Sequence, residues 1–553
     1  MNLSILVADS LHINKKNFGS FFKFIEKIKA KIYFEDSHKD WISLYGVYDQ
    51  KLDKLYGKIE ILSKLTEDEL WKFKINDIQL FPICRAELLS LVAPQPIWYS
   101  TPYPQTSKDI FSKLYTENRT ALFQNMAAAW YWIDFWKKRL LELNSFTHCC
   151  VFSGGLIYQK SLIEQLKYTP TKVMVMESLF TGNEYYCEER YSSIANNCDI
   201  KHKAIYTNHV KHLETGNDYD RERTKAINKI LLSKNKNVEQ PIFSEEIKFL
   251  ENNLPCVGII GQVVNDFSVL EYENKGISTI NFYQELIFNL ASANINVIMK
   301  THPWEEKKNN IRTALTKDVL EKYVQTLPEN LQNRIHIVDH YSIKKLFNQV
   351  QFIVGLNSQG LLEAAFEGLK PVQFGNAFYG NRDFTYDYHI NDIDQFITDL
   401  TSGKIQGTLS LNELNAFEQF MTILLQKHTV SIHDSGIVTL QKIFLQPSPI
   451  ALAKPQPATS SKEKINDNPP VSRNTETTLQ PNTLNNDKSS EPNKINTANA
   501  APPKAAPKEE IILNEPKKNR KLAKFKSNPY QFFVDSRNPL VRFLRHFFSP
   551  KTN

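Results

Sequence analysis

FIVGLNSQGLLEAAFEGLKPVQFG, residues 352–375, predicts a strand, a tight polar turn, a helix that a glycine ends, and a second strand. Gly368 marks the end of the helix, and Lys370 and Pro371 begin the strand that follows. Strands that alternate with helices in this way are typical of a parallel sheet covered on both faces. The stretch therefore predicts an α/β fold.

The same alternation extends upstream of this stretch. The strands CVGIIGQ, NVIMK and RIHIVD come before it, with a helix over residues 281–295. Nearer the start lie a strand over residues 3–8, a helix over residues 120–143, and the strands THCCVF and KVMVMES. Two such series predict two doubly wound, Rossmann-type domains with a cleft between them, over residues 1–245 and 246–447.

Length and composition agree with two globular domains. The chain has 553 residues, of which 41% are hydrophobic. A chain of 553 residues is too long to fold around one hydrophobic core. Its six cysteines show no CxxC pair and no metal-ligand spacing, so we expect reduced thiols in the cytoplasm and no disulfide framework. No apolar run approaches roughly 18 residues, and the first residues resemble a strand, so we expect neither a transmembrane helix nor a signal peptide.

The last part of the chain differs in composition from the rest. Residues 448–516 are rich in Pro, Ala, Asn, Thr, Ser and Lys, with too few apolar side chains for a core, and predict a disordered linker. Residues 517–553 carry ten Lys or Arg and one acidic residue, whereas the net charge of the whole chain is +7. The basic character therefore belongs to the tail, which argues against nucleic-acid binding by the body.

The tail also predicts an amphipathic helix that begins near Asn538 and Pro539. Its apolar side chains follow helical spacing, and its basic ones fall on other faces. The apolar side chains are Leu540, Phe543, Leu544 and Phe547, and the basic ones are Arg542 and Arg545. We expect peripheral contact with the anionic inner face of the cytoplasmic membrane, and the alternative is a helix that docks on the protein or on a partner.

A candidate phosphate site follows the strand NVIMK, where Lys300, His302 and Pro303 leave the sheet. Ligands of parallel α/β sheets bind beyond the carboxyl ends of the strands. A lysine supplies a positive charge and an imidazole a directed donor, which together suit a phosphate. For this motif alone, the alternative is an ordinary strand exit with a locally bonded histidine.

The polar turn of the opening stretch adds to this site. Ser358, Gln359 and Gly360 begin the predicted helix, where free N–H groups and the helix dipole attract an anion. Glu363 lies one turn further on and can accept hydrogen bonds from ribose hydroxyls. Alternatively, Ser358 is an N-cap and Glu363 compensates the dipole, and the two interpretations are compatible.

Two carboxylates are candidates for the chemistry. Gln262 and Asp266 follow the strand CVGIIG, and a carboxylate at such a position can act as a base or a nucleophile. Glu177, at the end of KVMVMES, would face Asp266 across the cleft if both domains wind as predicted. A solvated loop aspartate is the alternative for Asp266.

The order of these motifs resembles that of the bacterial capsule polysaccharide biosynthesis proteins, the β-Kdo transferases of capsule lipid termini and their lipopolysaccharide relatives. The resemblance covers roughly residues 145–385. It rests on VFSGGLIYQKSLIEQ, VMVMESLFTGNEYY, GQVVNDFSV, MKTHPWE and LNSQGLLEAAFEGLKPVQFGNAFYG. It implies a GT-B glycosyltransferase of capsule biosynthesis in a Gram-negative bacterium. The implied donor is CMP-β-Kdo, used with retention, and the implied acceptor is lipid-linked or a polysaccharide.

The resemblance also implies which residues bind the nucleotide. The family's HP motif falls on His302 and Pro303, where it would contact the CMP phosphate. The family's serine-containing turn falls on Ser358 and Gln359, and its helix acid on Glu363. No DxD-type metal motif stands out beside the candidate phosphate residues, so we expect no cofactor and no metal.

The family's Gln…Asp motif falls on Gln262 and Asp266, which makes Asp266 the candidate nucleophile. Glu177 becomes a candidate acid/base or acceptor-site residue. The sequence departs from the family pattern at residues 267–269, where a second acidic residue or glutamine is usual, and at Ser178, where glycine is common. These departures bear on the sugar donor and the acceptor more than on the nucleotide site.

Other functions fit the same motifs. A sialyltransferase-like enzyme of GT-B fold would also use a CMP-sugar, and a teichoic-acid-type polymerase would use a CDP-linked polyol. A non-catalytic scaffold, recruited by the tail to other capsule biosynthesis or export proteins, belongs to a different class. Failure to bind any cytidine nucleotide would favour the scaffold.

Overall fold

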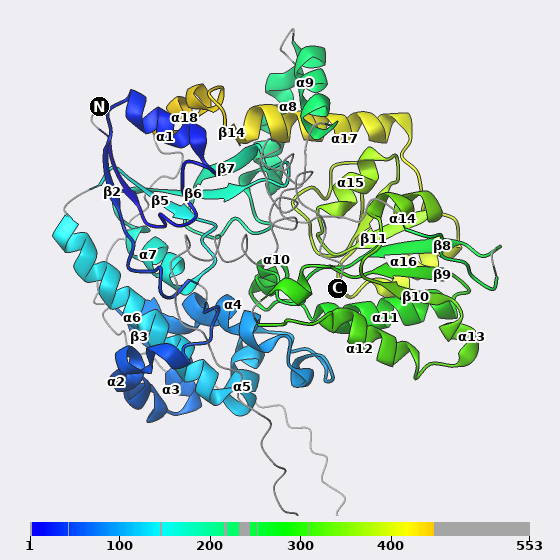
Figure 1. Ribbon diagram of the computed structural model, residues 1–553, viewed down its shortest axis with the longest axis horizontal. Coiled ribbons are helices and arrows are strands. Elements are labelled where there is room, and N and C mark those ends of the chain that lie inside the picture. The colour runs from blue at the N-terminus through cyan, green and yellow to red at the C-terminus, as the bar shows by residue number, and fades with distance from the viewer. Residues whose placement is uncertain are drawn as a thin grey trace, which may run out of the picture. The chain divides into compact units, whose positions relative to one another are not determined.

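The computed structural model describes residues 3–42, 44–143, 146–214, 218–231, 244–251, 253–308 and 310–446. The chain divides into two compact units, Met1–Thr459 and Ser460–Asn553, and the second lies wholly outside the described residues. The predicted linker and the predicted amphipathic tail therefore lie outside them too. Two six-stranded sheets form the framework of the first unit (Figure 1).

The first sheet has the strand order β14-β7-β6-β5-β1-β2. Its strands are β1 (Ser4–Val7), β2 (Lys31–Phe34), β5 (His148–Phe152), β6 (Lys172–Ser178), β7 (Glu184–Glu189) and β14 (Val430–Ser431). Strands β2, β1, β5 and β6 are parallel, and β7 runs antiparallel to β6. The chain passes from β1 to β2 on one side and later to β5 on the other. The strand order therefore reverses between β1 and β5.

Apolar side chains cover both faces of this sheet, because successive residues of a strand point to opposite faces. Ile5 and Val7 belong to a cluster that includes side chains of α1 (Gly19–Lys27) and α18 (Gly436–Leu445). Leu6 belongs instead to the main core. The helices of the first sheet that contribute to that core are α2 (Leu52–Ser63), α4 (Leu80–Val92), α5 (Ser107–Glu117), α6 (Arg119–Leu143) and α7 (Ile157–Leu166).

The second sheet has the strand order β10-β9-β8-β11-β12-β13, and every neighbouring pair is parallel. Its strands are β8 (Cys256–Ile260), β9 (Asn296–Lys300), β10 (Ile335–Val338), β11 (Phe352–Gly355), β12 (Pro371–Gln373) and β13 (Tyr386–Asp387). Every residue of β8 and β9 is buried, as expected for central parallel strands. The strand order reverses between β8 and β11, and ligands of such sheets bind at that point.

Helices α11 (Thr279–Ser292), α12 (Leu315–Val324), α14 (Ile343–Gln349), α15 (Gly360–Phe366) and α16 (Ile393–Thr401) accompany this sheet. The other helices are α3 (Glu67–Lys72), α8 (Lys203–Glu214), α9 (Tyr219–Leu231), α10 (Phe267–Leu270), α13 (Glu329–Gln332) and α17 (Leu411–Ile423). A small antiparallel pair is formed by β3 (Lys74–Ile75) and β4 (Ile78–Gln79).

After α17 the chain returns to the first sheet. Strand β14 pairs with β7 in antiparallel fashion, and α18 packs against α1. Leu440 and Phe444 of α18 fill the same cluster as Phe21 and Phe24 of α1. These last residues lie within the range predicted for the second domain, yet they complete the first sheet. The apolar pattern of a helix does not indicate which of two sheets the helix will pack against.

The fold class expected from the sequence, a GT-B-like α/β fold with two Rossmann-type sheets, is confirmed. The strands and helices expected for the described residues are present. The structure adds strands that the alternation did not predict, namely β2, β13, the β3–β4 pair, and β7 and β14, which pair in antiparallel fashion. All six cysteines are free and buried, as expected. No helix within the described ranges is long and apolar enough to cross a membrane.

Candidate active site

A cavity of about 560 Å³ lies where the carboxyl ends of the two sheets face each other. The second sheet lines it with the segments after β8, β9 and β11, and the first sheet contributes Ser153 and Glu177 from the ends of β5 and β6. Strands β8 and β11 are those between which the strand order reverses. The residues predicted for nucleotide binding and catalysis all line this cavity: Glu177, Gln262, Asp266, Lys300, His302, Pro303, Ser358, Gln359, Gly360 and Glu363.

Lys300, the last residue of β9, brings a buried positive charge to the cavity. Its carbonyl accepts a hydrogen bond from the Gly261 N–H at 2.8 Å, which fixes the strand end against β8. Burial lowers the pKa of Lys300 to about 8, and the negative charges of Glu363 and Asp339 oppose that shift. Its ammonium has no carboxylate within 4.0 Å among the described residues. A buried lysine without a counterion suits an anionic ligand.

His302 presents a neutral hydrogen-bond donor to the same cavity. The Trp304 N–H donates to Nδ1 of His302 at 3.1 Å, so the proton of the neutral ring lies on Nε2. Burial lowers the pKa of His302 to about 4, and the charges of Lys300 and Lys308 contribute to that shift. Pro303, which follows, also lines the cavity. At neutral pH the imidazole is therefore an uncharged Nε2–H donor.

The turn after β11 also lines the cavity that holds these two residues. Helix α15 begins at Gly360, so Gln359 and not Ser358 is its N-cap, and Ser358 Oγ accepts the Gly360 N–H at 3.3 Å. The Tyr379 hydroxyl holds the Ser358 carbonyl at 2.7 Å. Burial raises the pKa of Glu363, and the positive charge of Lys300 opposes that shift. The turn therefore brings a hydroxyl and an acid to the side of the cavity that Lys300 occupies.

Gln262 is a buried residue that connects the ends of β8 and β11. Its side-chain amide donates to Ser268 Oγ at 2.7 Å and to Asn357 Oδ1, and its Oε1 accepts the Asn357 N–H at 3.4 Å. The Gln262 N–H donates to the Tyr283 hydroxyl at 2.9 Å. Because both the NH₂ group and the oxygen of its side-chain amide are hydrogen-bonded within the protein, Gln262 has a structural role at the wall of the cavity. Sequence reasoning missed Asn357 and Ser268, although Asn357 stands directly before the predicted serine turn.

Asp266 and Glu177 bring two carboxyls from different sheets to one cavity. Asp266 caps α10 and accepts the Ser268 N–H at 2.8 Å. Oε2 of Glu177 is buried and has no hydrogen-bond partner within the described part of the chain. Burial and the nearby charge of Asp266 raise the pKa of Glu177 to about 7, although a hydrogen bond with Ser153 opposes the rise. Glu177 can therefore bind or release a proton near neutral pH.

Lys308 is a cavity residue that sequence reasoning missed. Its ammonium donates to Asn265 Oδ1 at 3.0 Å. Burial lowers its pKa, and the negative charges of Asp266 and Glu305 oppose that shift. Lys308 belongs to the run WEEKK after the HP motif, but a charged run of this kind usually lies on the solvated surface and does not indicate a cavity residue. Lys308 adds a second cation to the cavity.

A possible metal-binding group lies elsewhere among the described residues. Ligand atoms of Glu306, Asp339 and His340 lie within 4.8 Å of one another, and Glu306 and His340 are exposed. None of these three side chains lines the cavity. Exposed acidic groups of this kind are common without an ion.

Comparison with known proteins agrees with the motifs. Residues 181–402 match the family described as capsule polysaccharide biosynthesis protein. No curated protein matches the sequence. The predicted resemblance to that family is therefore confirmed for residues 181–402.

Solved structures with similar folds share little sequence with this chain. The Thermosulfurimonas dismutans KpsC β-Kdo 2,4 transferase is 13% identical, with a TM-score of 0.30, over 50% of this chain and 79% of that chain. The β-Kdo 2,7 transferase from the same organism is 14% identical, with a TM-score of 0.29, over 56% and 89%. An E. coli structure titled trehalose-6-phosphate bound with UDP-2-fluoro glucose is 9% identical, with a TM-score of 0.29, over 81% and 100%.

Proposed function

We propose that this chain, whose residues 181–402 match the capsule polysaccharide biosynthesis family, is a glycosyltransferase that uses a CMP-activated sugar, most simply β-Kdo from CMP-Kdo. The acceptor is a lipid-linked or polysaccharide hydroxyl of capsule biosynthesis. One observation carries the proposal. A buried lysine without a counterion and a neutral imidazole donor, Lys300 and His302, share a cavity with the carboxyl pair Glu177 and Asp266.

The cation and the donor suit the leaving group. CMP leaves as a phosphate monoester, so the reaction needs stabilisation of negative charge and no proton on the leaving oxygen. Lys300 supplies that charge from a buried position, and the Nε2–H of His302 supplies a directed hydrogen bond. The imidazole is fixed before substrate arrives by the Trp304 N–H, and the pairing of β9 fixes the backbone of Lys300 at the strand end. Fixed donors in a partly dehydrated site stabilise developing charge better than water does.

The carboxyl pair suits a double displacement. In the first step a carboxylate oxygen of Asp266 forms a bond to the anomeric carbon, and the bond from that carbon to the phosphate oxygen breaks, with the electron pair leaving on CMP. In the second step the acceptor hydroxyl displaces the carboxylate and loses its proton to a base. Glu177 is one candidate for that base, because its pKa is about 7. Two inversions at one carbon give retention.

The experiment that tests the proposal is a calorimetric and thermal-shift titration of the full chain with CMP, CDP and UDP. We expect selective binding of CMP that His302→Ala weakens by about tenfold or more. Lys322→Met, a change on the exposed face of α12, serves as the matched surface control. Preference for CDP or UDP would exclude a CMP-sugar donor and keep a transferase. Binding of none of the three would favour the scaffold.

We further propose that the basic tail holds the enzyme at an anionic membrane surface. The support is the sequence pattern alone, in which Phe543 and Phe547 share a predicted apolar face with Leu540. Flotation of the full chain with vesicles containing phosphatidylglycerol tests it. We expect binding that Phe543→Ser with Phe547→Ser abolishes, and equal binding by both forms would exclude this role.

A further inference from the structure

A second pocket, of about 340 Å³, adjoins the candidate active site. It shares Ser153, Phe267, Trp304 and Lys308 with the larger cavity. Its lining includes His12 beyond the end of β1 and Phe152 at the end of β5, the two strands between which the order of the first sheet reverses. A ligand is expected at that point of the sheet. A molecule bound there would lie next to the cavity assigned to the nucleotide, as an acceptor must.

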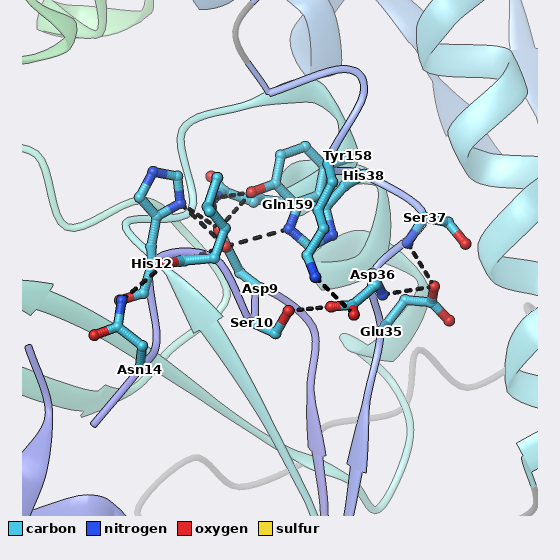
Figure 2. Close-up of polar contacts among 12 residues, drawn as sticks. Asp9, Ser10, His12, Asn14, Glu35, Asp36, Ser37, His38, Tyr158 and Gln159 are labelled. Atoms are coloured by element: carbon cyan, nitrogen blue, oxygen red, sulfur yellow. Dashed lines mark hydrogen bonds and ion pairs between the residues drawn. The ribbon is translucent and has the colours of Figure 1, made fainter. Parts of the chain in front are cut away.

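His12 is held in one orientation within this pocket. Its Nδ1 lies 3.0 Å from each carboxylate oxygen of Asp9, and its ring stacks on Phe152 with centroids 4.5 Å apart. Nε2 has no hydrogen-bond partner among the residues that the structure describes, and Figure 2 shows it directed away from Asp9. Because Asp9 accepts the Nδ1 proton, the neutral ring carries a free lone pair on Nε2.

Asp9 is a fully buried carboxylate surrounded by donors (Figure 2). It accepts the His12 N–H at 3.1 Å, the Gln159 amide at 3.1 Å and the Tyr158 hydroxyl, and Nε2 of His38 lies 3.3 Å away. Burial opposes its charge, but the contacts with the two imidazoles and the hydrogen bond from Tyr158 together outweigh burial and hold the pKa of Asp9 far below its usual range. The carboxylate therefore stays ionised and stabilises a positive charge on the neighbouring imidazole.

We propose that His12 is the catalytic base that takes the proton of the acceptor hydroxyl, and that Asp9 positions it. The inference rests on the proposed glycosyltransferase function. As the acceptor oxygen bonds to the anomeric carbon, its O–H bond breaks and the proton passes to Nε2 of His12. The bond from that carbon to the Asp266 carboxylate breaks at the same time, and its electron pair returns to the carboxylate oxygen.

Glu177 is the competing base, and its place in the structure differs. It lines the larger cavity beside Asp266 and is absent from the lining of the second pocket. His12 lies on the acceptor side, and its partner Asp9 already carries the compensating negative charge. The geometry therefore favours His12 for the proton that the acceptor loses.

Azide distinguishes the two bases, because it is an anionic nucleophile that needs no deprotonation. The experiment measures CMP release from CMP-Kdo, and glycosyl azide by mass spectrometry, with and without azide. The proteins are the full-length wild type, His12→Gln, Glu177→Gln and Asp9→Asn. His433→Gln, an exposed histidine outside both cavities, is the matched control. Calorimetry with CMP and the melting temperature are recorded for each protein.

We expect steady-state CMP release by His12→Gln, with water as the acceptor, to be about a hundredfold slower because the second displacement becomes rate-limiting, with CMP affinity and melting temperature unchanged. Azide should restore that rate to within about tenfold of the wild type and give glycosyl azide. Asp9→Asn should lower kcat and KM for CMP-Kdo together and leave kcat/KM for CMP-Kdo unchanged, because only the second displacement is slowed, with the same rescue. If Asp9→Asn does not fold, His12→Gln alone decides.

Two results would overturn the inference while the transferase stands. One is a His12→Gln protein as active as the wild type. The other is rescue by azide of Glu177→Gln and not of His12→Gln. A wild type that neither binds CMP nor consumes CMP-Kdo would instead remove the proposed function, and the inference with it.

Discussion

The two points at which strand order reverses carry opposite electrostatic arrangements. Beyond β1, the buried Asp9 carboxylate is surrounded by donors, and its charge is used within the protein to hold His12. Beyond β9, next to the reversal in the second sheet, Lys300 is buried without a counterion, and the N–H of His302 points to a cavity without a protein acceptor among the described residues. One set of polar groups is satisfied internally and the other is left for a ligand.

This difference indicates that Asp9 positions another side chain, whereas Lys300 binds a ligand. A buried polar group costs free energy unless it is hydrogen-bonded or paired. A buried group without a partner is therefore expected where a bound ligand supplies that partner. Lys300 fits that description, whereas Asp9 is complete and acts through the imidazole that it holds. Substitutions of Asp9 and His12 should therefore change the rate, and substitutions of Lys300 and His302 should change nucleotide affinity.

The largest effect is expected at Asp266, in the segment that follows β8. Asp266→Asn keeps an oxygen that can accept the Ser268 N–H, so α10 should retain its cap, but an amide cannot form the glycosyl ester. We expect CMP release from CMP-Kdo to fall by at least about a thousandfold, with an unchanged melting temperature. Asp318→Asn, on the exposed face of α12, is the control. A variant that keeps most of its activity would exclude Asp266 as the nucleophile.

The next effect concerns the unpaired lysine. Lys300→Met should weaken CMP binding by roughly thirtyfold, because a charge-assisted contact is lost. The pKa of Lys300 is about 8, so its ammonium loses its proton as the pH rises through that value. The affinity of the wild type should therefore fall between about pH 7 and pH 10, and that of the variant should not. Calorimetry across that range measures both. A wild-type affinity that does not change with pH would contradict the role given to Lys300.

A smaller effect on stability is expected at Glu177. Its folded-state pKa is raised from 4.5 to about 7, so folded protein holds a proton that the unfolded chain releases above about pH 4.5. The wild type therefore loses stability as the pH rises from 4.5 through 7, and Glu177→Gln removes that loss. We expect the variant to be more stable by about 1–2 kcal/mol at pH 8, with a much smaller difference at pH 5.

Urea unfolding at the two pH values measures this difference. Glu329→Gln, an exposed change, should alter the free energy of unfolding by less than about 0.5 kcal/mol at either pH. A Glu177→Gln protein that is less stable at pH 8 would mean that the carboxylate is stabilised by the fold, in contradiction to its unpaired Oε2.

The second sheet and its cavity were predictable from the sequence, because each signal was local. A strand that ends in Lys300 and His302, and a turn at Ser358, place those side chains at the carboxyl edge of a parallel sheet whatever the rest of the chain does. The tautomer of His302 was not predictable, since it depends on a backbone N–H that the turn geometry directs at Nδ1. Neither was Lys308, because a lysine in a charged run looks the same whether it is buried or solvated.

The first sheet was predictable in its strands but not in its polar groups. Asp9 and His12 follow a short strand in a run without a recognised motif, and their partners Tyr158 and Gln159 come from α7, far along the chain. Only the parallel pairing of β1 with β5 brings these segments together. Long-range pairing also explains β14, whose two residues complete a sheet that begins more than four hundred residues earlier.

The smallest effect is expected from metal removal. The cavity already has two lysines and an imidazole donor where a metal ion would otherwise neutralise phosphate charge, and Glu306, Asp339 and His340 lie outside its lining. We expect EDTA to change CMP affinity and CMP release by less than about twofold. Glu306→Gln should behave like the wild type in both measurements. A loss of activity in EDTA that Mg²⁺ restores would mean that Lys300 and His302 bind the phosphate together with a metal ion and do not suffice alone.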